Sequence, residues 1–137
     1  MATIPESHRG LLSGAYYATF TTIAPDGIPE NTIVWTALDG DTVLVGTTAD
    51  RRKSKNIRKN PKVALCVLDP EDGFHWIDVR GEVEKILPDS DFETINLLAK
   101  IYTGADSFYG GVMPADAAGT EERIVIRIRP DRIVTSP

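Results

Sequence analysis

The residues best suited to chemistry in this sequence are a run of cations between Thr47 and Pro61. Nine consecutive positions hold six of them and no acid: Arg51, Arg52, Lys53, Lys55, Arg58 and Lys59. The chain as a whole has a net charge of −5, so this positive charge is concentrated against an acidic background. A confined cluster of this kind favours a site for an anion.

The run also fits a short helix, which Pro61 would end. We expect Asp50 or Thr48 to be the N-cap, followed at once by three of the cations. A helix start carries partial positive charge, so cations there cost stability unless an anion binds. Free N–H groups and Arg side chains together make a phosphate or carboxylate site, to which Thr47 and Thr48 could add hydroxyl donors.

Two other interpretations of the basic run stay open on the residues alone. A solvated basic face that aids solubility is the commoner reason for a charge run. A nucleic-acid patch would carry interleaved aromatic side chains, and this segment has none. The acidic remainder of the chain also argues against nucleic acid.

The composition is that of an ordinary globular domain. The 137 residues are 42% hydrophobic and 26% charged, which fits one domain over residues 1–137. No apolar run approaches the roughly 20 residues of a membrane helix, and the N-terminus lacks the apolar region of a secretory signal. With a single cysteine there is no internal disulfide. We therefore expect a cytoplasmic protein. Within the domain we also expect a mobile N-terminal leader at 1–12 and a loop at 105–120.

The elements that must position the basic run are predicted to be mainly strands. They are Ala15–Ile23, Asn31–Leu38, Thr42–Thr48, Lys62–Asp69, Phe74–Ile86 and Glu122–Pro130, the last with a possible extension past Pro130. Turn signals at 24–27 and 38–41 join the first three into hairpins. The continuous apolar run in Lys62–Asp69 predicts a strand buried on both faces.

The clearest helix is Pro88–Gly104, with a start marked by Pro88, Asp89 and Ser90. Its apolar stripe is Phe92, Ile95, Leu98, Ala99 and Tyr102. Leading hairpins with two short helices predict a small barrel rather than a doubly wound sheet. There is no Gly-rich dinucleotide fingerprint and no Walker loop, so any nucleotide-like cofactor must be held by other means.

Few other side chains suggest catalysis. Trp35 and Trp76 are each as typical of core packing as of contact with a ligand. His75 could donate a proton, but a lone strand histidine is more often simply half-buried. Cys66 is expected in the core. No metal-ligand or Ser-His-Asp spacing occurs, and we assign no catalytic residue and no metal.

Several separated segments resemble the pyridoxamine 5'-phosphate oxidase-like split β-barrel proteins, and most closely their F420-dependent oxidoreductase branch. In order along the chain they are "IPESHRGLL", "NTIVWTALDGDTVLVGTTADRRKSKNIRKNPKVALCVLDPEDGFHWIDVRGEVEKI" and "INLLAKIYTG". This resemblance implies a mainly β fold, a six-stranded FMN-binding-like split β-barrel that forms a homodimer. It also implies a flavin or deazaflavin cofactor between the two subunits.

The resemblance further implies which residues bind the cofactor. Its phosphate would be held by Thr47, Thr48, Arg51, Arg52, Lys53, Lys55 and Asn56. The strand with Thr32, Val34 and Trp35 would line the cofactor ring, and Trp76 would reach it from the partner subunit.

The implied activity is that of an F420-dependent reductase, which transfers a hydride to an electron-poor double bond of a small organic substrate. Arg52 followed by Lys53 also resembles the FMN-binding oxidases, so an FMN-dependent enzyme is the first alternative. A protein that binds a flavin, F420 or a tetrapyrrole without catalysis is the second. The loop at 105–120 differs from the branch, which leaves the substrate open.

Overall fold

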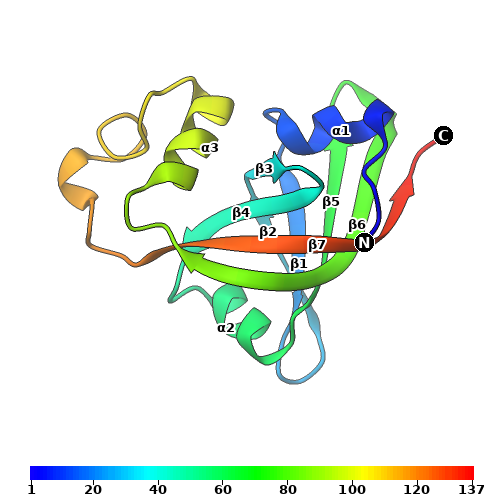
Figure 1. The fold of residues 1–137 in the computed structure, drawn as a ribbon, viewed down its shortest axis with the longest axis horizontal. Helices are drawn as coiled ribbons and strands as arrows, with labels where there is room; N and C mark the ends of the chain where they lie inside the picture. The colour runs from blue at the N-terminus through cyan, green and yellow to red at the C-terminus, as the bar shows by residue number, and fades with distance from the viewer.

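The computed structural model describes residues Met1–Pro137 and is built around one antiparallel sheet (Figure 1). Its strands are β1 (Ala18–Ile23), β2 (Pro29–Val34), β3 (Thr36–Asp39), β4 (Thr42–Thr48), β5 (Lys62–Asp69), β6 (Asp72–Pro88) and β7 (Arg123–Thr135). Across the sheet they run in the order β2-β1-β5-β6-β7-β4-β3. The helices are α1 (Glu6–Ser13), α2 (Arg52–Lys59), α3 (Glu93–Thr103) and the short η1 (Ala115–Ala117).

The sheet curls because its two edge strands are consecutive in the sequence. β2 ends at Val34 and β3 begins at Thr36, so only Trp35 separates the two edges. Two successive Cα steps span about 7 Å at most, which brings the edges together at this point. The predicted strand Asn31–Leu38 is therefore two strands on opposite edges. This division gives seven strands where six were expected, within a mainly β split barrel as predicted.

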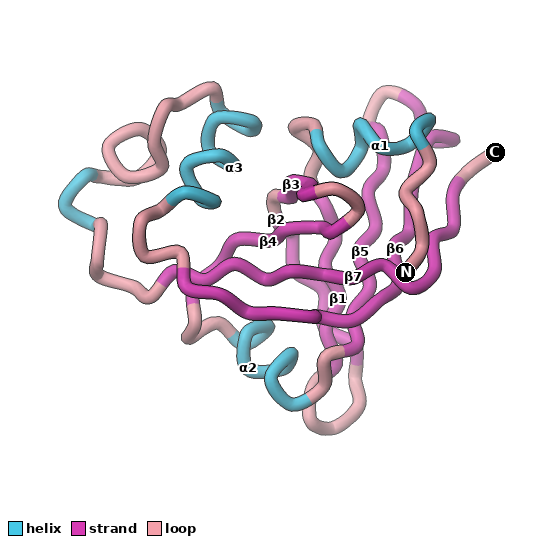
Figure 2. Tube along the Cα trace, viewed as in Figure 1, coloured by secondary structure: helices cyan, strands magenta, loops and turns pink.

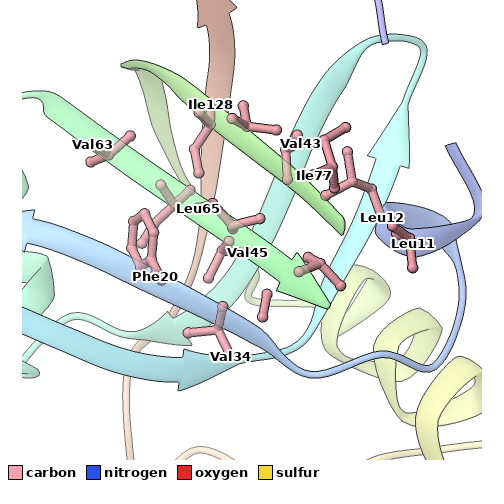
Figure 3. Packing of buried hydrophobic residues seen from close by; sticks show 14 of the residues in the cluster. Leu11, Leu12, Phe20, Val34, Val43, Val45, Val63, Leu65, Ile77 and Ile128 are labelled. Atoms are coloured by element: carbon pink, nitrogen blue, oxygen red, sulfur yellow. The ribbon is translucent and has the colours of Figure 1, made fainter. Parts of the chain in front are cut away.

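The barrel interior is filled by the side chains that alternate inward along the strands. Figure 3 shows Phe20, Val45, Leu65, Ile77 and Ile128 converging there from five different strands. The inward alternation of β7 was predicted correctly, because its isoleucines at 124, 126 and 128 are all buried. A branched or aromatic side chain buried in this way contributes about 1.5–3 kcal/mol.

The first residues of the chain are part of this core. The expected mobile leader is wrong, because Glu6–Ser13 forms α1 and buries Leu11 and Leu12 against the barrel (Figure 3). At the end of α1, the carbonyl of Leu12 accepts a hydrogen bond from the Thr36 hydroxyl at 2.9 Å. The helix therefore covers one end of the barrel, on the side where both chain ends lie (Figure 1).

β5 does not have the two buried faces that its apolar run predicted. Its buried residues alternate, with Val63, Leu65 and Val67 inward and Cys66 and Leu68 exposed. The expectation that Cys66 is a core residue is therefore wrong. The outward face of β5 is apolar, but no element of this chain covers it. The apolar run in the sequence therefore does not reflect burial of both faces within one chain.

The two longest strands bend where their pairing shifts. The register between β6 and β7 is irregular at Arg80/Gly81 and again at Val83/Lys85. A side chain at Gly81 would place its Cβ 2.0 Å from the carbonyl oxygen of Arg129, so only glycine permits this close approach. Such bulges increase the local twist and help an open sheet to curl.

α3 covers the outer face of the sheet rather than the barrel interior. Ile95 and Leu98 pack there with Ala37, Leu44 and Val125 in a second, smaller apolar cluster. The helix begins at Glu93, later than predicted. Its first turn is capped from a distance, because the buried Asp89 carboxylate accepts the N–H groups of Thr94 and Ile95 at 3.0 and 2.9 Å.

The helices lie at the periphery of the strands (Figure 2). None of them combines the length and the apolar character that crossing a membrane requires. α3 and the long loop after it stand on the side of the molecule opposite α1 (Figure 1). The loop at 105–120 contains η1, and the N–H of Phe108 donates to the side chain of Asn96 on α3 at 2.9 Å.

Candidate functional site

A cavity of about 240 Å³ lies between the outer face of the sheet, α2, α3 and the loop after α3. Most of its wall is apolar. Its lining residues are Tyr17, Ile33, Val34, Trp35, Gly46, Lys53, Ile95, Leu98, Phe108 and Arg123. We call it the main cavity. It brings the joined sheet edges, the start of the basic helix and the C-terminal strand to one place.

Trp35 forms the aromatic wall of the main cavity. Its indole stacks on Tyr102 of α3 with centroids 5.0 Å apart, and it meets Phe108 edge-on at 6.3 Å. Tyr102 is fixed in turn, because its hydroxyl donates to the carbonyl of Tyr16 at 2.7 Å and accepts the N–H of Thr36 at 2.9 Å. The wall is therefore held by hydrogen bonds as well as by packing.

The start of α2 supplies a cation to the main cavity. The N-cap position is Arg51, with extended backbone, and no side chain caps the first turn. The expectation that Asp50 or Thr48 would be the N-cap is therefore wrong. Lys53 lines the cavity, and burial, followed by the positive charge of Arg51, lowers its pKa below the usual value. The uncapped N–H groups and this ammonium are the donors that an anion requires.

A second cavity, of about 310 Å³, lies on the other side of α2. It is lined by polar residues and a proline: Pro25, Asp50, Arg52, Lys55, Asn56 and Lys59. α2 thus divides its cations, with Lys53 on the main cavity and Arg52, Lys55 and Lys59 on the second, whereas Arg58 lines neither. The two cavities share no lining residue and differ in character, since the main cavity is mostly apolar and the second is polar and cationic.

Glu30 of β2 neutralises part of this basic surface. Its carboxylate accepts hydrogen bonds from Arg52 Nε and Asn56 Nδ2, both at 2.8 Å. These two bonds, Arg52 first, lower the pKa of Glu30. Asn56 is also buried and donates to the hydroxyl of Thr22 at 3.0 Å. Its amide therefore attaches α2 to the β1–β2 hairpin.

The two threonines before the basic helix are buried at the end of β4. The hydroxyl of Thr48 donates to the carboxylate of Asp50 at 2.8 Å, and the Thr48 carbonyl accepts the hydroxyl of Ser54 at 2.7 Å. The Thr48 bonds stabilise the turn into α2. Contact of Thr47 and Thr48 with a phosphate stays a prediction.

The structure brings most of the predicted site residues to the two cavities. Val34, Trp35 and Lys53 line the main cavity, whereas Arg52, Lys55 and Asn56 line the second. The others line neither of them: Thr32, Thr47, Thr48, Arg51 and Trp76. The hydroxyl oxygen of Thr32 is buried and has no hydrogen-bond partner.

Sequence reasoning missed the far wall of the main cavity. Gly46, Phe108 and Arg123 come from β4, the long loop and the start of β7. Arg123 carries a signal that could have been noticed, since it begins the alternating segment "RIVIRIR" on the face opposite the isoleucines. Nothing in the local sequence indicates that this face meets Lys53.

Comparison with known proteins supports the resemblance noted in the sequence. The chain matches the family model of pyridoxamine 5'-phosphate oxidase over residues 4–136. It is similar to a solved structure described as an F420 reductase, with 34% identity, a TM-score of 0.82, and coverage of 96% of this chain and 98% of that chain. A search of the curated proteins finds no match.

Other solved structures share the fold at lower identity. A conserved hypothetical protein from Mycobacterium tuberculosis is 20% identical, with a TM-score of 0.73, over 98% of this chain and 85% of that chain. General Stress Protein 26 from Bacillus anthracis is 22% identical, with a TM-score of 0.68, over 96% and 92%. These two similarities show the fold alone.

Proposed function

Because this chain belongs to the pyridoxamine 5'-phosphate oxidase family, we propose that it is a reductase that uses coenzyme F420. The family and the similar F420 reductase support an oxidoreductase with a cofactor of the flavin type. The observation that carries the choice of F420 is the division of the cations of α2 between two cavities. A cofactor with both a phosphate and a glutamate tail suits cations spread over two cavities better than one with a single phosphate does.

The residues present fit such a cofactor. An apolar wall beside Trp35 suits a planar ring, and the uncapped start of α2 with Lys53 suits a phosphate. Lys55 and Lys59 in the second cavity have no acid paired with them, so they suit carboxylates of the tail.

When bound, the reduced cofactor supplies a hydride for an electron-poor double bond. The protein's own part is to bind and orient. Trp35 and Phe108 limit the access of water to the apolar end, and Lys53 holds negative charge at the other. Orientation of this kind contributes to rate without a dedicated acid or base.

We also propose that the working form is a homodimer that closes the main cavity. Tyr17 and Ile33 line that cavity and are 68% and 64% exposed. They continue on the outside of the sheet into Cys66 and Leu68 of β5, with Trp76 beside Leu68 on β6. We call these five residues the outer apolar face. A second copy on this face would cover the cavity and could bring its own Trp76 near the cofactor.

Cofactor titration tests the proposed function. F420 and FMN are each titrated into the purified protein at low and high salt, with absorbance and fluorescence as readouts. We expect F420 to bind more tightly, and less tightly at high salt because anion capture is screened. Tight FMN binding without F420 binding would contradict the proposal and support the FMN-dependent alternative.

Variants of the basic helix locate the binding site. Lys53→Ala should weaken F420 binding by roughly tenfold or more, since hydrogen bonds to charged groups contribute about 1.5–3 kcal/mol. Arg52→Ala should have a smaller effect, because Arg52 is paired with Glu30. Lys85→Ala, an exposed lysine of β6, is the matched control. Equal affinities for all four proteins would reject the assignment.

A substrate panel separates an enzyme from a carrier. Reduced F420 is mixed with the protein and with enones, quinones or biliverdin, and oxidation of the cofactor is followed. We expect turnover with at least one electron-poor double bond. Binding of F420 with no oxidation across the whole panel would favour the non-catalytic alternative.

The homodimer is tested by mass in solution. Leu68 is half-exposed on the outer apolar face and lines neither cavity, so Leu68→Glu should weaken association without touching the site directly. Sedimentation should give a dimer for the natural chain and a monomer for the variant. A natural chain that sediments as a monomer with bound F420 would contradict the shared site.

A further inference from the structure

Two arginines of β7, Arg123 and Arg132, have no carboxylate partner, and of these Arg132 is exposed whereas Arg123 is partly buried. Arg123, Arg127 and Arg129 alternate on one face of the strand. Arg127 pairs with Asp39 at 3.0 Å, and Arg129 pairs with Asp131 at 2.9 Å. No carboxylate pairs with Arg123, and its Nε is buried without a hydrogen-bond partner. A buried guanidinium donor in this state is costly unless something accepts its hydrogen bond.

The guanidinium of Arg123 is directed into the main cavity. It lies over the ring of Phe108, with its central carbon 5.1 Å from the ring centroid. It also reaches Gly46 on the neighbouring strand, where a Cβ would lie 3.9 Å from Arg123 Nη2, an ordinary contact, and 2.9 Å from Leu98 Cδ1, a clash. The absence of a side chain at Gly46 therefore lets Leu98 of α3 pack closely on β4 beside the guanidinium.

The rest of the main cavity makes an anion the fitting partner. Seven of its ten lining residues are hydrophobic, and Lys53 is the other charged one. No acid lines the cavity, so two cations share an apolar space. In such surroundings an arginine fork binds a carboxylate through two parallel hydrogen bonds, which adds both affinity and orientation. The ring of Phe108 satisfies the face of the guanidinium but not its N–H groups.

We propose that Arg123 binds the carboxylate of the substrate, and that the substrates are planar carboxylic acids whose double bond is conjugated with that group. This inference rests on the proposed function, since it names the substrate class of the same cavity. With the cofactor ring against Trp35, the ring of Phe108 suits the flat conjugated part of the substrate, and Arg123 orients it through its anionic end. Arg123 is thus a specificity-determining residue, separate from the cations that α2 presents.

The probe for this proposal is trans-cinnamate, with trans-cinnamamide as its neutral counterpart of nearly the same shape. Both are titrated by calorimetry into the purified natural chain and into Arg123→Met and Arg127→Met. The natural chain should prefer the acid by roughly tenfold or more. Arg123→Met should lose this preference, whereas Arg127→Met, the control on the same strand face, should keep it.

Several outcomes would overturn the proposal. They are equal binding of acid and amide by the natural chain, binding of neither, and an undiminished preference in Arg123→Met. The variant should fold, because methionine removes an unpartnered buried donor. If it does not, Arg123→Lys keeps the charge without the fork and should show a weakened preference for the acid; an unchanged preference would contradict the role of the fork.

Titration with F420 separates this proposal from the proposed function. Arg123→Met should bind F420 as the natural chain does. A loss of F420 affinity as large as that of Lys53→Ala would place the guanidinium at the cofactor and overturn the proposal. If the natural chain binds no F420 yet prefers cinnamate through Arg123, the cofactor assignment fails and the anion site stands.

Discussion

The indole of Trp35 lies parallel to the ring of Tyr102, with centroids 5.0 Å apart and planes inclined by 8°. Trp35 is the residue at which the two edges of the sheet meet, and Tyr102 belongs to the helix on its outer face. This stack therefore connects closure of the barrel to the position of α3. Trp35 also lines the main cavity, so the stack that fixes its indole serves both fold and site.

Removal of the Tyr102 hydroxyl should destabilise the protein while leaving the stack in place. Tyr102→Phe leaves the carbonyl of Tyr16 and the N–H of Thr36 without their partner. We expect a loss of about 1–3 kcal/mol in the free energy of unfolding, measured by urea denaturation. Tyr109→Phe is the control, since the Tyr109 hydroxyl makes no hydrogen bond; equal effects of both changes would argue against this role.

Asn56 should matter more for folding than for binding. Its amide joins α2 to Thr22 and Glu30, and it is buried. Asn56→Ala should lower the free energy of unfolding by about 1–3 kcal/mol. Lys55→Ala, an exposed change in the same cavity, should leave stability nearly unchanged and weaken F420 binding instead. Weakened F420 binding with unchanged stability in Asn56→Ala would instead support the predicted contact of Asn56 with the cofactor phosphate.

F420 affinity should decline as the pH rises. The decline should begin at a lower pH than it would for a lysine with the usual pKa. The charged form of Lys53 attracts the anion, and burial lowers the pKa at which that charge is lost. Between the lowered pKa and the usual one, the unfolded chain binds a proton that the folded chain does not, so stability should rise with pH there.

Lys53→Arg is the matched variant for this pH dependence, because a guanidinium keeps its charge across the range. Its F420 affinity, measured by titration from neutral to alkaline pH, should stay flat where that of the natural chain declines. Parallel declines in both proteins would show that another group is responsible.

α1 should be required for full stability. Leu12→Ala removes a fully buried side chain and should cost about 2–5 kcal/mol in the free energy of unfolding. Leu97→Ala on α3 is the control, because Leu97 is exposed and its loss should change stability by about 0.5 kcal/mol or less. Equal small effects on the denaturation midpoint would indicate that α1 does not pack as described.

Much of the fold could be predicted from local pattern. The bounds of β4 and β5 were predicted correctly, because each strand is a short apolar segment between clear turn or helix signals. Gly104 does end α3, in the left-handed conformation that favours glycine, with φ of 77°. The helix in the basic run was also predicted from a local signal, because Pro61 marks the point by which it must end.

The errors arose where burial depends on distant partners. A doubly buried β5 and a core position for Cys66 followed from apolarity alone, yet the outer side of β5 has no cover within this chain. The apolar residues of the leader at 1–12 do not indicate which surface they pack on, and Leu11 and Leu12 are buried because the barrel end is open to them. Local periodicity carries no information about what lies against the outer side of β5 or about the barrel end on which the leader packs.

By itself the sequence determined that a cationic helix start follows a strand, because both signals are local. Only the tertiary structure decided which cations meet which cavity and that Arg123 and Lys53 line the same, mostly apolar one. The physical reason is strand pairing. Register between β4 and β7 sets Arg123 opposite Thr48, at the entrance to α2, while Arg127 falls beside Asp39 and is neutralised. Whether a charge stays free for a ligand is therefore a property of the folded sheet.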